Sequence, residues 1–190
     1  MLRLPGYDYT RAGAYFVTVV THNREAIFGK VNGEEVQLTP AGEIARVCWE
    51  AIPCHFTRTG LDEFIIMPNH MHGILWILDG EKLDRPTVEA RHAVPLQQTV
   101  MDLTGGGSAL AIERFGIPRS GSIPTIVRSF KSAVTRRINS VLATPGAVVW
   151  QRGYYDHIVR DEGDLGRIRA YITDNPAQWE LDRENPLSGQ

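Results

Sequence analysis

The run FIIMPNHMHGILWIL, from Phe64 to Leu78, limits the possible folds more than any other part of the sequence. Its residues are mostly of the branched and aromatic kinds that strands favour, and Pro68-Asn69 interrupts it, because proline cannot donate to a strand ladder. We therefore predict that DEFIIM is one strand, and that HMHGILWIL is the next strand or the same strand after a bend. Successive side chains of a strand point to opposite faces, so His70 and His72 share one face and Met71 packs on the other.

Two other segments also have the composition of strands. AYFVTVVT, from Ala14 to Thr21, is largely apolar on both faces, which predicts a strand near the centre of a sheet. VVWQ and YYDHIVRD are separated by Arg152-Gly153, and they are typical of a strand pair or of one bulged strand.

Two helices are predicted between these strands. The first begins at Thr39 and Pro40 after a turn around residues 30–33, and its apolar face is expected to contain Ile44, Val47, Cys48, Ala51 and Ile52. The second follows Ser122, has Pro124 in its first turn and runs to Ala143, with an apolar stripe of Ile126, Phe130, Val134 and Ile138.

A last helix, DLGRIRAYITD, is predicted to end by Asp174, because Pro176 disfavours helical geometry at Asn175. The order of strands and helices is then β-α-β-β-α-β followed by a helix, which is typical of an α+β, ferredoxin-like antiparallel sheet with helices packed on it. We expect one domain over residues 1–190, with a flexible insertion over residues 79–121, where Pro, Gly and charged residues show no period.

The net charge of -2 argues against a generally basic nucleic-acid binder, but the charge is unevenly distributed. Residues 114–155 contain no acidic residue, and their basic residues are Arg114, Arg119, Arg128, Lys131, Arg136, Arg137 and Arg152. Such a local positive region suits a confined phosphate-binding surface, while a solvated helix face is the simpler alternative.

The chain has no uninterrupted apolar segment of roughly 18 residues, and its N-terminus lacks the apolar centre of a secretory signal. We therefore expect a cytoplasmic protein that does not enter the membrane. Cys48 and Cys54 are too few and wrongly spaced for a disulfide framework or a Cys-rich zinc site, so both are expected to be buried, reduced thiols.

Two imidazoles on one face of a strand can bind a single metal ion, so His70 and His72 are candidate ligands. The alternative is two partly exposed polar residues on a solvated sheet face. The apolar surroundings favour the metal site, because a buried imidazole needs a partner.

Tyr171 and Asn175 are four residues apart and therefore lie on one face of the last helix. An amide oxygen is an acceptable metal ligand, and a phenol can act as a covalent nucleophile once it is activated, because a free tyrosine has a pKa of about 10. The alternative is a packing tyrosine that precedes an Asn-Pro helix terminator.

Four motifs, PNHMH, SFKSAVTRRIN, WQRGYYDHIVRDEGDL and AYITDNP, together resemble the REP-associated tyrosine transposases, which are relatives of the HUH single-stranded DNA transposases. The resemblance extends from Tyr15 to Pro176 and leaves out only the insertion. It implies the HUH endonuclease fold, a central antiparallel sheet with flanking helices. It also implies cleavage and rejoining of single-stranded hairpin DNA, with repetitive extragenic palindromes as substrates.

The family roles carry over residue by residue. His70, His72 and Asn175 correspond to the metal ligands, and Tyr171 corresponds to the nucleophile that forms a 5′-phosphotyrosine. The family uses Mg²⁺ or Mn²⁺, whereas the imidazoles alone would suit zinc or manganese. Tyr154 and Tyr155 are rival nucleophiles.

The DNA-binding residues that we expect are Arg128, Lys131, Arg136, Arg137, Arg152, Tyr154 and Tyr155, through phosphate contacts and base stacking. Trp150 could stack on bases or belong to the core. Two rival functions are a domesticated protein that binds hairpin DNA without cutting it, and a zinc hydrolase in which Tyr171 only donates a hydrogen bond. The family contains both monomers and dimers, so either state is expected.

Overall fold

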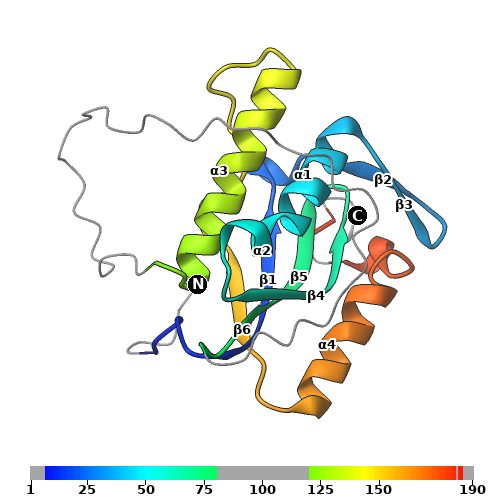
Figure 1. Cartoon of the computed structure of the whole chain (residues 1–190). Coiled ribbons are helices and arrows are strands. Elements are labelled where there is room, and N and C mark those ends of the chain that lie inside the picture. The colour runs from blue at the N-terminus through cyan, green and yellow to red at the C-terminus, as the bar shows by residue number, and fades with distance from the viewer. Residues whose placement is uncertain (1–6, 81–119, 183, 186–190) are drawn as a thin grey trace, which may run out of the picture.

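The computed structural model describes residues 7–80, 120–182 and 184–185. Its centre is a four-stranded antiparallel sheet in the order β4-β5-β1-β6 (Figure 1), made of β1 (Gly13–Val20), β4 (Thr59–Ile66), β5 (His70–Ile77) and β6 (Tyr155–Ile158). The predicted central position of β1 is confirmed, and HMHGILWIL is a separate strand that follows the turn at residues 67–69. The expected α+β fold with an antiparallel sheet is therefore confirmed.

One face of the sheet is covered by α1 (Pro40–Glu50) and α3 (Ile123–Val141), which pack against each other (Figure 1). The predicted start of α3 is confirmed, and its predicted stripe is buried in full: Ile126, Phe130, Val134 and Ile138. The strands add the side chains that point to this face, which are Tyr15, Val17, Val19, Met71, Leu75 and Ile77. Together they form the main hydrophobic core, and Met71 packs in it as predicted.

The start of α1 at Thr39 is confirmed, since the Thr39 hydroxyl accepts a hydrogen bond of 3.2 Å from the Gly42 amide. Its predicted apolar face is partly wrong, because Val47 is exposed and Trp49 is buried instead. The indole lies beneath Gly73, where an added Cβ would come within 2.4 Å of the ring. Trp49 can therefore turn inward only because β5 has a glycine at this position.

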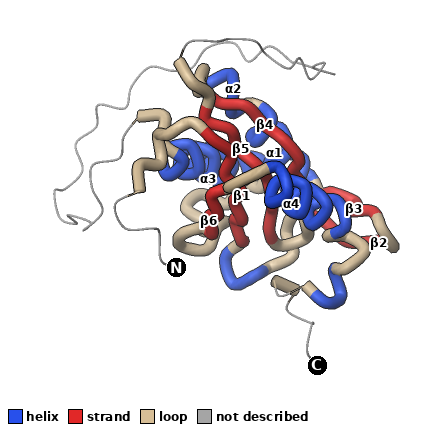
Figure 2. Tube along the Cα trace, turned by 90° about the horizontal axis from the view of Figure 1, so that it is seen from below, coloured by secondary structure: helices blue, strands red, loops and turns tan. Residues whose placement is uncertain are grey.

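The other face of the sheet is covered by α4 (Glu162–Asp174), and Figure 2 shows α3 and α4 on either side of β1 and β5. The Asp161 side chain caps α4 by accepting a 2.8 Å hydrogen bond from the Asp164 amide. The predicted end at Asp174 is confirmed. A small apolar cluster joins α4 to the sheet, and its buried members are Ala14, Phe16, Ile74, Leu165 and Ile172.

Some elements differ from the predictions. The segment around Gly33, expected as a turn, is a two-stranded sheet of β2 (Gly29–Asn32) and β3 (Glu35–Leu38), with Gly33 at a φ of 65° between them. Of VVWQ, Trp150 forms an isolated bridge with Thr21. The remaining short elements are η1 (His22–Arg24), α2 (Ile52–His55) and η2 (Trp179–Leu181).

Most of the predicted insertion, residues 81–119, lies outside the described residues. Within the described part of the chain, no helix has both the length and the apolar character that a membrane crossing requires. Cys48 and Cys54 are both free thiols. The prediction of burial is confirmed for Cys48 and wrong for Cys54, which lies exposed in the short α2.

Candidate active site

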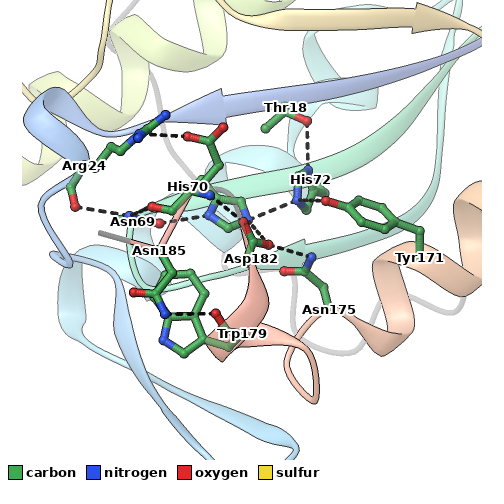
Figure 3. Close-up of polar contacts among 11 residues, drawn as sticks. Thr18, Arg24, Asn69, His70, His72, Tyr171, Asn175, Trp179, Asp182 and Asn185 are labelled. Atoms are coloured by element: carbon green, nitrogen blue, oxygen red, sulfur yellow. Dashed lines mark hydrogen bonds and ion pairs between the residues drawn. The ribbon is translucent and has the colours of Figure 1, made fainter. Parts of the chain in front are cut away.

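The strand β5 places His70 and His72 together on the face that α4 covers, where they are 0% and 3% exposed. Their Nε2 atoms lie 3.0 Å apart, and both point toward the end of α4 (Figure 3). Two nitrogen ligands at about 2.1 Å from one ion and roughly 90° apart would be separated by about 3.0 Å. The pair therefore has the spacing of two neighbouring ligands of one metal ion.

Asn69 fixes the orientation of the His70 ring. The Asn69 Nδ2 donates to the backbone oxygens of Arg24 (3.1 Å) and Glu184 (2.6 Å), so its Oδ1 is the atom that faces His70. This oxygen lies 2.9 Å from His70 Nδ1, which must then carry the proton. The Nε2 of the neutral ring is left with its lone pair directed into the site.

Thr18 of β1 gives His72 a similar partner. Its hydroxyl lies 2.8 Å from His72 Nδ1 and can accept a hydrogen bond from the Nδ1 proton, which leaves Nε2 of that ring for a metal. β1 and β5 are paired so that Thr18 stands directly opposite His72. The sheet register therefore determines which atom of the His72 imidazole faces the site.

Burial also keeps both rings neutral. It lowers the pKa of His70 to about 4, a shift that the nearby Asp182 carboxylate opposes in part. Burial and the neighbouring His70 lower the pKa of His72 well below its usual range. Both imidazoles are thus in the form that binds metals near neutral pH.

Asn175, at the C-terminal end of α4, has a buried amide oxygen that is unsatisfied. Its Nδ2 donates a 3.0 Å hydrogen bond to Asp182 Oδ2, which identifies the other atom of the amide as Oδ1. This Oδ1 has no hydrogen-bond partner among the described residues, although Asn175 is 2% exposed. Buried acceptors are nearly always satisfied, so an amide oxygen without a hydrogen-bond donor beside two imidazoles is a suitable ligand atom for a cation.

Asp182 was not predicted as a site residue. It follows η2, and its carboxylate lies 3.8 Å from His70 Nε2. The potential ligand atoms of His70, His72 and Asp182 all lie within 4.8 Å of one another. The periodicity of α4 could not predict this residue, because the chain turns back toward β5 only after the helix has ended.

Tyr171 lies on the same helix as Asn175, one turn earlier, with its hydroxyl 3.2 Å from His72 Nε2 of the same chain (Figure 3). Its ring contacts the rings of His72 and Phe16, and the residue is 45% exposed. The hydroxyl is therefore next to the candidate metal site, on a residue that is half-exposed.

The rival tyrosines lie differently. Tyr155 is exposed on the same face of the sheet, but Thr18 of β1 stands between it and His72 in the strand register. Tyr154 is half-buried and packs against the main core. Of the three tyrosines, Tyr171 is the one with a hydrogen-bond contact to a candidate ligand in the described part of the chain.

The basic residues of α3 lie on the helix that covers the opposite face of the sheet. Arg128 and Arg136 are exposed, whereas Arg137 donates to the Cys48 sulfur at 3.3 Å. The Lys131 ammonium donates to the backbone oxygens of Gln151 and Gly153, and burial lowers its pKa to about 8. The predicted basic residues are thus divided between solvent and structural contacts.

A cavity of about 590 Å³ lies beside η1 and brings Arg152 together with His22, Asn23, Arg24, Val148, Trp150 and Gln151. It is linked to the candidate site, because the backbone oxygen of Arg24 is bound by Asn69, the partner of His70. Trp150 is 7% exposed and packs against Phe28 and Phe130, which favours its role in the core.

The fold and the site define a class of protein: an α+β sheet protein with two histidines on one strand, facing a tyrosine and an asparagine on a helix. A solved structure of a REP-associated tyrosine transposase bound to a REP hairpin has the same fold. The two align with a TM-score of 0.56 at 16% identity, over 94% of this chain and 74% of that chain. The match shows the fold that the family resemblance implies.

The chain belongs to the same family as an uncharacterized protein of Haemophilus influenzae, to which it is 38% identical over 184 residues. The alignment covers 96% of this chain and 90% of the relative. No family model matches the chain.

Proposed function

We propose that the protein is a metal-dependent tyrosine transposase that cuts and rejoins single-stranded hairpin DNA, as the REP-associated tyrosine transposases do. The observation that carries this proposal is the unpaired amide oxygen of Asn175, which lies one helical turn after Tyr171 and beside the two histidines. A protein that only bound DNA would have no use for a nucleophile next to an incomplete ligand set.

The residues of the site fit a divalent metal ion. His70 and His72 would supply two nitrogens, and Asn175 and Asp182 would supply oxygens. Oxygen ligands favour Mg²⁺ or Mn²⁺, while imidazoles alone would favour zinc, so the mixed set supports the first two ions. The bound ion would supply positive charge that polarises the phosphate to be cut.

In the proposed reaction, the Tyr171 oxygen attacks the phosphorus of the scissile phosphodiester and loses its proton. The bond from phosphorus to the 3′-oxygen breaks, and that oxygen takes up a proton to become a free 3′-hydroxyl. The 5′ phosphate stays on Tyr171 as a phosphotyrosine, and attack by a 3′-hydroxyl reverses the step. One ester bond replaces another throughout, so rejoining needs no external energy source.

The substrate would approach from the side of α4, where Tyr171 is exposed. Arg152, which lines the cavity beside η1, would hold a phosphate, Arg24 would do so in addition to its ion pair with Glu184, and the exposed ring of Tyr155 would stack on an unpaired base. Arg128 and Arg136 on α3 would contact a more distant part of the hairpin. Such DNA processing would take place in the cytoplasm.

The test uses a single-stranded hairpin oligonucleotide that carries a label at its 3′ end, incubated with the full chain and Mn²⁺ or Mg²⁺. Because the phosphotyrosine retains the 3′ part of the DNA, we expect a labelled covalent complex on a denaturing gel. It should form with the wild type and with Tyr155→Phe. It should be lost in Tyr171→Phe, in His70→Ala and with a chelator.

Other outcomes would favour a rival function. A complex that persists in Tyr171→Phe but not in Tyr155→Phe would show that the nucleophile is Tyr155 of β6. Hairpin binding without cleavage at any metal concentration would indicate a DNA-binding protein that does not cut. Zinc-dependent cleavage without a covalent complex would indicate a hydrolase.

A further inference from the structure

An irregularity in β4 directs a carboxylate toward α4. The pairing of β4 with β5 shifts between Leu61, opposite Leu75, and Phe64, opposite Gly73, so Asp62 and Glu63 together stand opposite Ile74. Such a bulge changes the direction of a side chain on the strand. At this bulge the Asp62 carboxylate points to the face that α4 covers.

The Asp62 carboxylate is held firmly. Its Oδ2 accepts a 2.9 Å hydrogen bond from the Trp76 indole, and its Oδ1 accepts one of 2.9 Å from the Glu63 amide. The side chain is 12% exposed. A carboxylate with two fixed donors of its own is a rigid anchor for a third group.

That third group is Arg169 of α4. Its Nε donates to Asp62 Oδ1 at 2.8 Å, and its Nη2 donates to Asp62 Oδ2 at 2.7 Å. This two-point geometry fixes the direction of the guanidinium as well as its distance. Consistent with it, the hydrogen bonds that Asp62 accepts, chiefly from Arg169, lower the pKa of its carboxyl to about 2.

Arg169 and Tyr171 lie on opposite flanks of α4. At 100° per residue, Leu165 and Ile172 point toward the sheet, and Arg169 lies roughly 50° to one side of that direction and Tyr171 roughly 110° to the other. A rotation of the helix that loosened Arg169 from β4 would therefore move the Tyr171 hydroxyl relative to His72. The small apolar cluster beneath α4 selects the side of the helix that faces the sheet, and the two-point contact with Asp62 adds a directional constraint at its flank.

We propose that the Asp62–Arg169 pair is a positioning device that sets the rotation of α4 and so holds the Tyr171 hydroxyl at the metal site. This proposal rests on the function proposed above. The two residues do not touch the reacting atoms: they act through the orientation of the helix that carries the nucleophile.

The test compares Arg169→Lys, which keeps the charge but loses the two-point geometry, with Arg167→Lys on the same helix. Arg167 is a matched control, because its side chain is 74% exposed and pairs with Asp164. At saturating hairpin DNA and Mn²⁺, we expect Arg169→Lys to form the covalent complex about tenfold more slowly, and Arg167→Lys to match the wild type. DNA affinity, Mn²⁺ affinity and the thermal midpoint should remain close to wild type in both.

Asp62→Asn provides a second variant. It should slow the reaction to a similar degree, and the double variant with Arg169→Lys should be no slower than either single variant, because both remove the same interaction. A wild-type rate in Arg169→Lys would overturn the proposal. So would a rate loss matched by an equal loss of DNA affinity, since Arg169 would then be a DNA contact.

A separate measurement tests the positioning without activity. Fluorotyrosine in place of Tyr171 should give a ¹⁹F resonance shifted by the rings of Phe16 and His72. We expect this resonance to move toward that of a free tyrosine in Arg169→Lys and to stay unchanged in Arg167→Lys. An unchanged resonance in Arg169→Lys would contradict the proposal. If the resonance moves in Arg169→Lys but the wild type forms no covalent complex, the positioning role stands and only the proposed function is rejected.

Discussion

The two faces of the sheet differ in how they are covered. The face under α1 and α3 is packed with apolar side chains, including Trp49, Phe130 and Met71. The face under α4 has a small apolar cluster and, beside it, His70, His72 and Asn175. The two faces therefore have different roles. The first face supplies most of the apolar packing that stabilises the fold, and the second can hold buried polar groups whose hydrogen bonds are not all satisfied.

The largest loss of stability should come from adding a side chain at Gly73, which points into the main core under α1 and α3. A Cβ on Gly73 would lie 2.4 Å from the Trp49 ring and 3.1 Å from the Phe64 Cβ. Gly73→Ala should therefore lower the free energy of unfolding by about 3 kcal/mol. Gly60→Ala is the control, because its Cβ would meet its nearest neighbour at an ordinary 3.5 Å. Chemical denaturation measures the free energy of unfolding of both variants. Equal losses in the two would contradict the close packing of Trp49 against Gly73.

A matched pair of phenylalanines separates the two faces directly. Phe130 packs between Trp49 and Trp150 in the main core, whereas Phe16 contacts the rings of His72 and Tyr171. Phe130→Leu should cost about 1.5 kcal/mol of stability and leave the rate of covalent complex formation unchanged. Phe16→Leu should slow that rate about 30-fold, because the nucleophile loses its support. Equal rate losses in the two variants would contradict the division between the faces.

The carboxylate that follows α4 should contribute to metal binding. Asp182→Asn keeps the size of the side chain and an acceptor for the Asn175 Nδ2, but removes the negative charge. We expect Mn²⁺ affinity, measured by calorimetry, to fall about tenfold. The exposed Glu180 is a matched control, and Glu180→Gln should bind Mn²⁺ as the wild type does. Unchanged affinity in Asp182→Asn would remove Asp182 from the ligand set.

The smallest effect concerns the link between β4 and α4. Hydrogen bonds, chiefly from Arg169, hold the pKa of Asp62 at about 2 in the folded chain, below the value of about 3.9 expected in the unfolded chain. The carboxylate therefore stabilises the fold above about pH 4, and this stability is lost as the pH falls through 2. Because Arg169 is 44% exposed, we expect only about 1 kcal/mol. The difference in unfolding free energy between wild type and Asp62→Asn, measured at several pH values, should become smaller as the pH falls. A difference that does not change with pH would contradict this prediction.

The sequence predicted those parts of the site that depend on local periodicity. Alternation along a strand placed His70 and His72 on one face, and helical spacing placed Tyr171 and Asn175 on another element. Which face of the sheet meets that helix depends on tertiary packing, and so do the positions of Asp182 and Asn69. The same limit explains why Val47 is exposed. Its helical spacing predicted burial, but Trp49 is buried instead, because Gly73 has no side chain and leaves room for the indole.

The most direct test of the account is to identify the residue that carries the DNA. The covalent complex formed with hairpin DNA and Mn²⁺ would be digested with protease and nuclease, and the modified peptide would be sequenced by mass spectrometry. We predict a nucleotide joined through its 5′ phosphate to Tyr171, on the peptide that contains Asn175. A modification on Tyr155, or a complex that forms equally well without metal, would contradict the claim that the face under α4 is a metal-dependent tyrosine site.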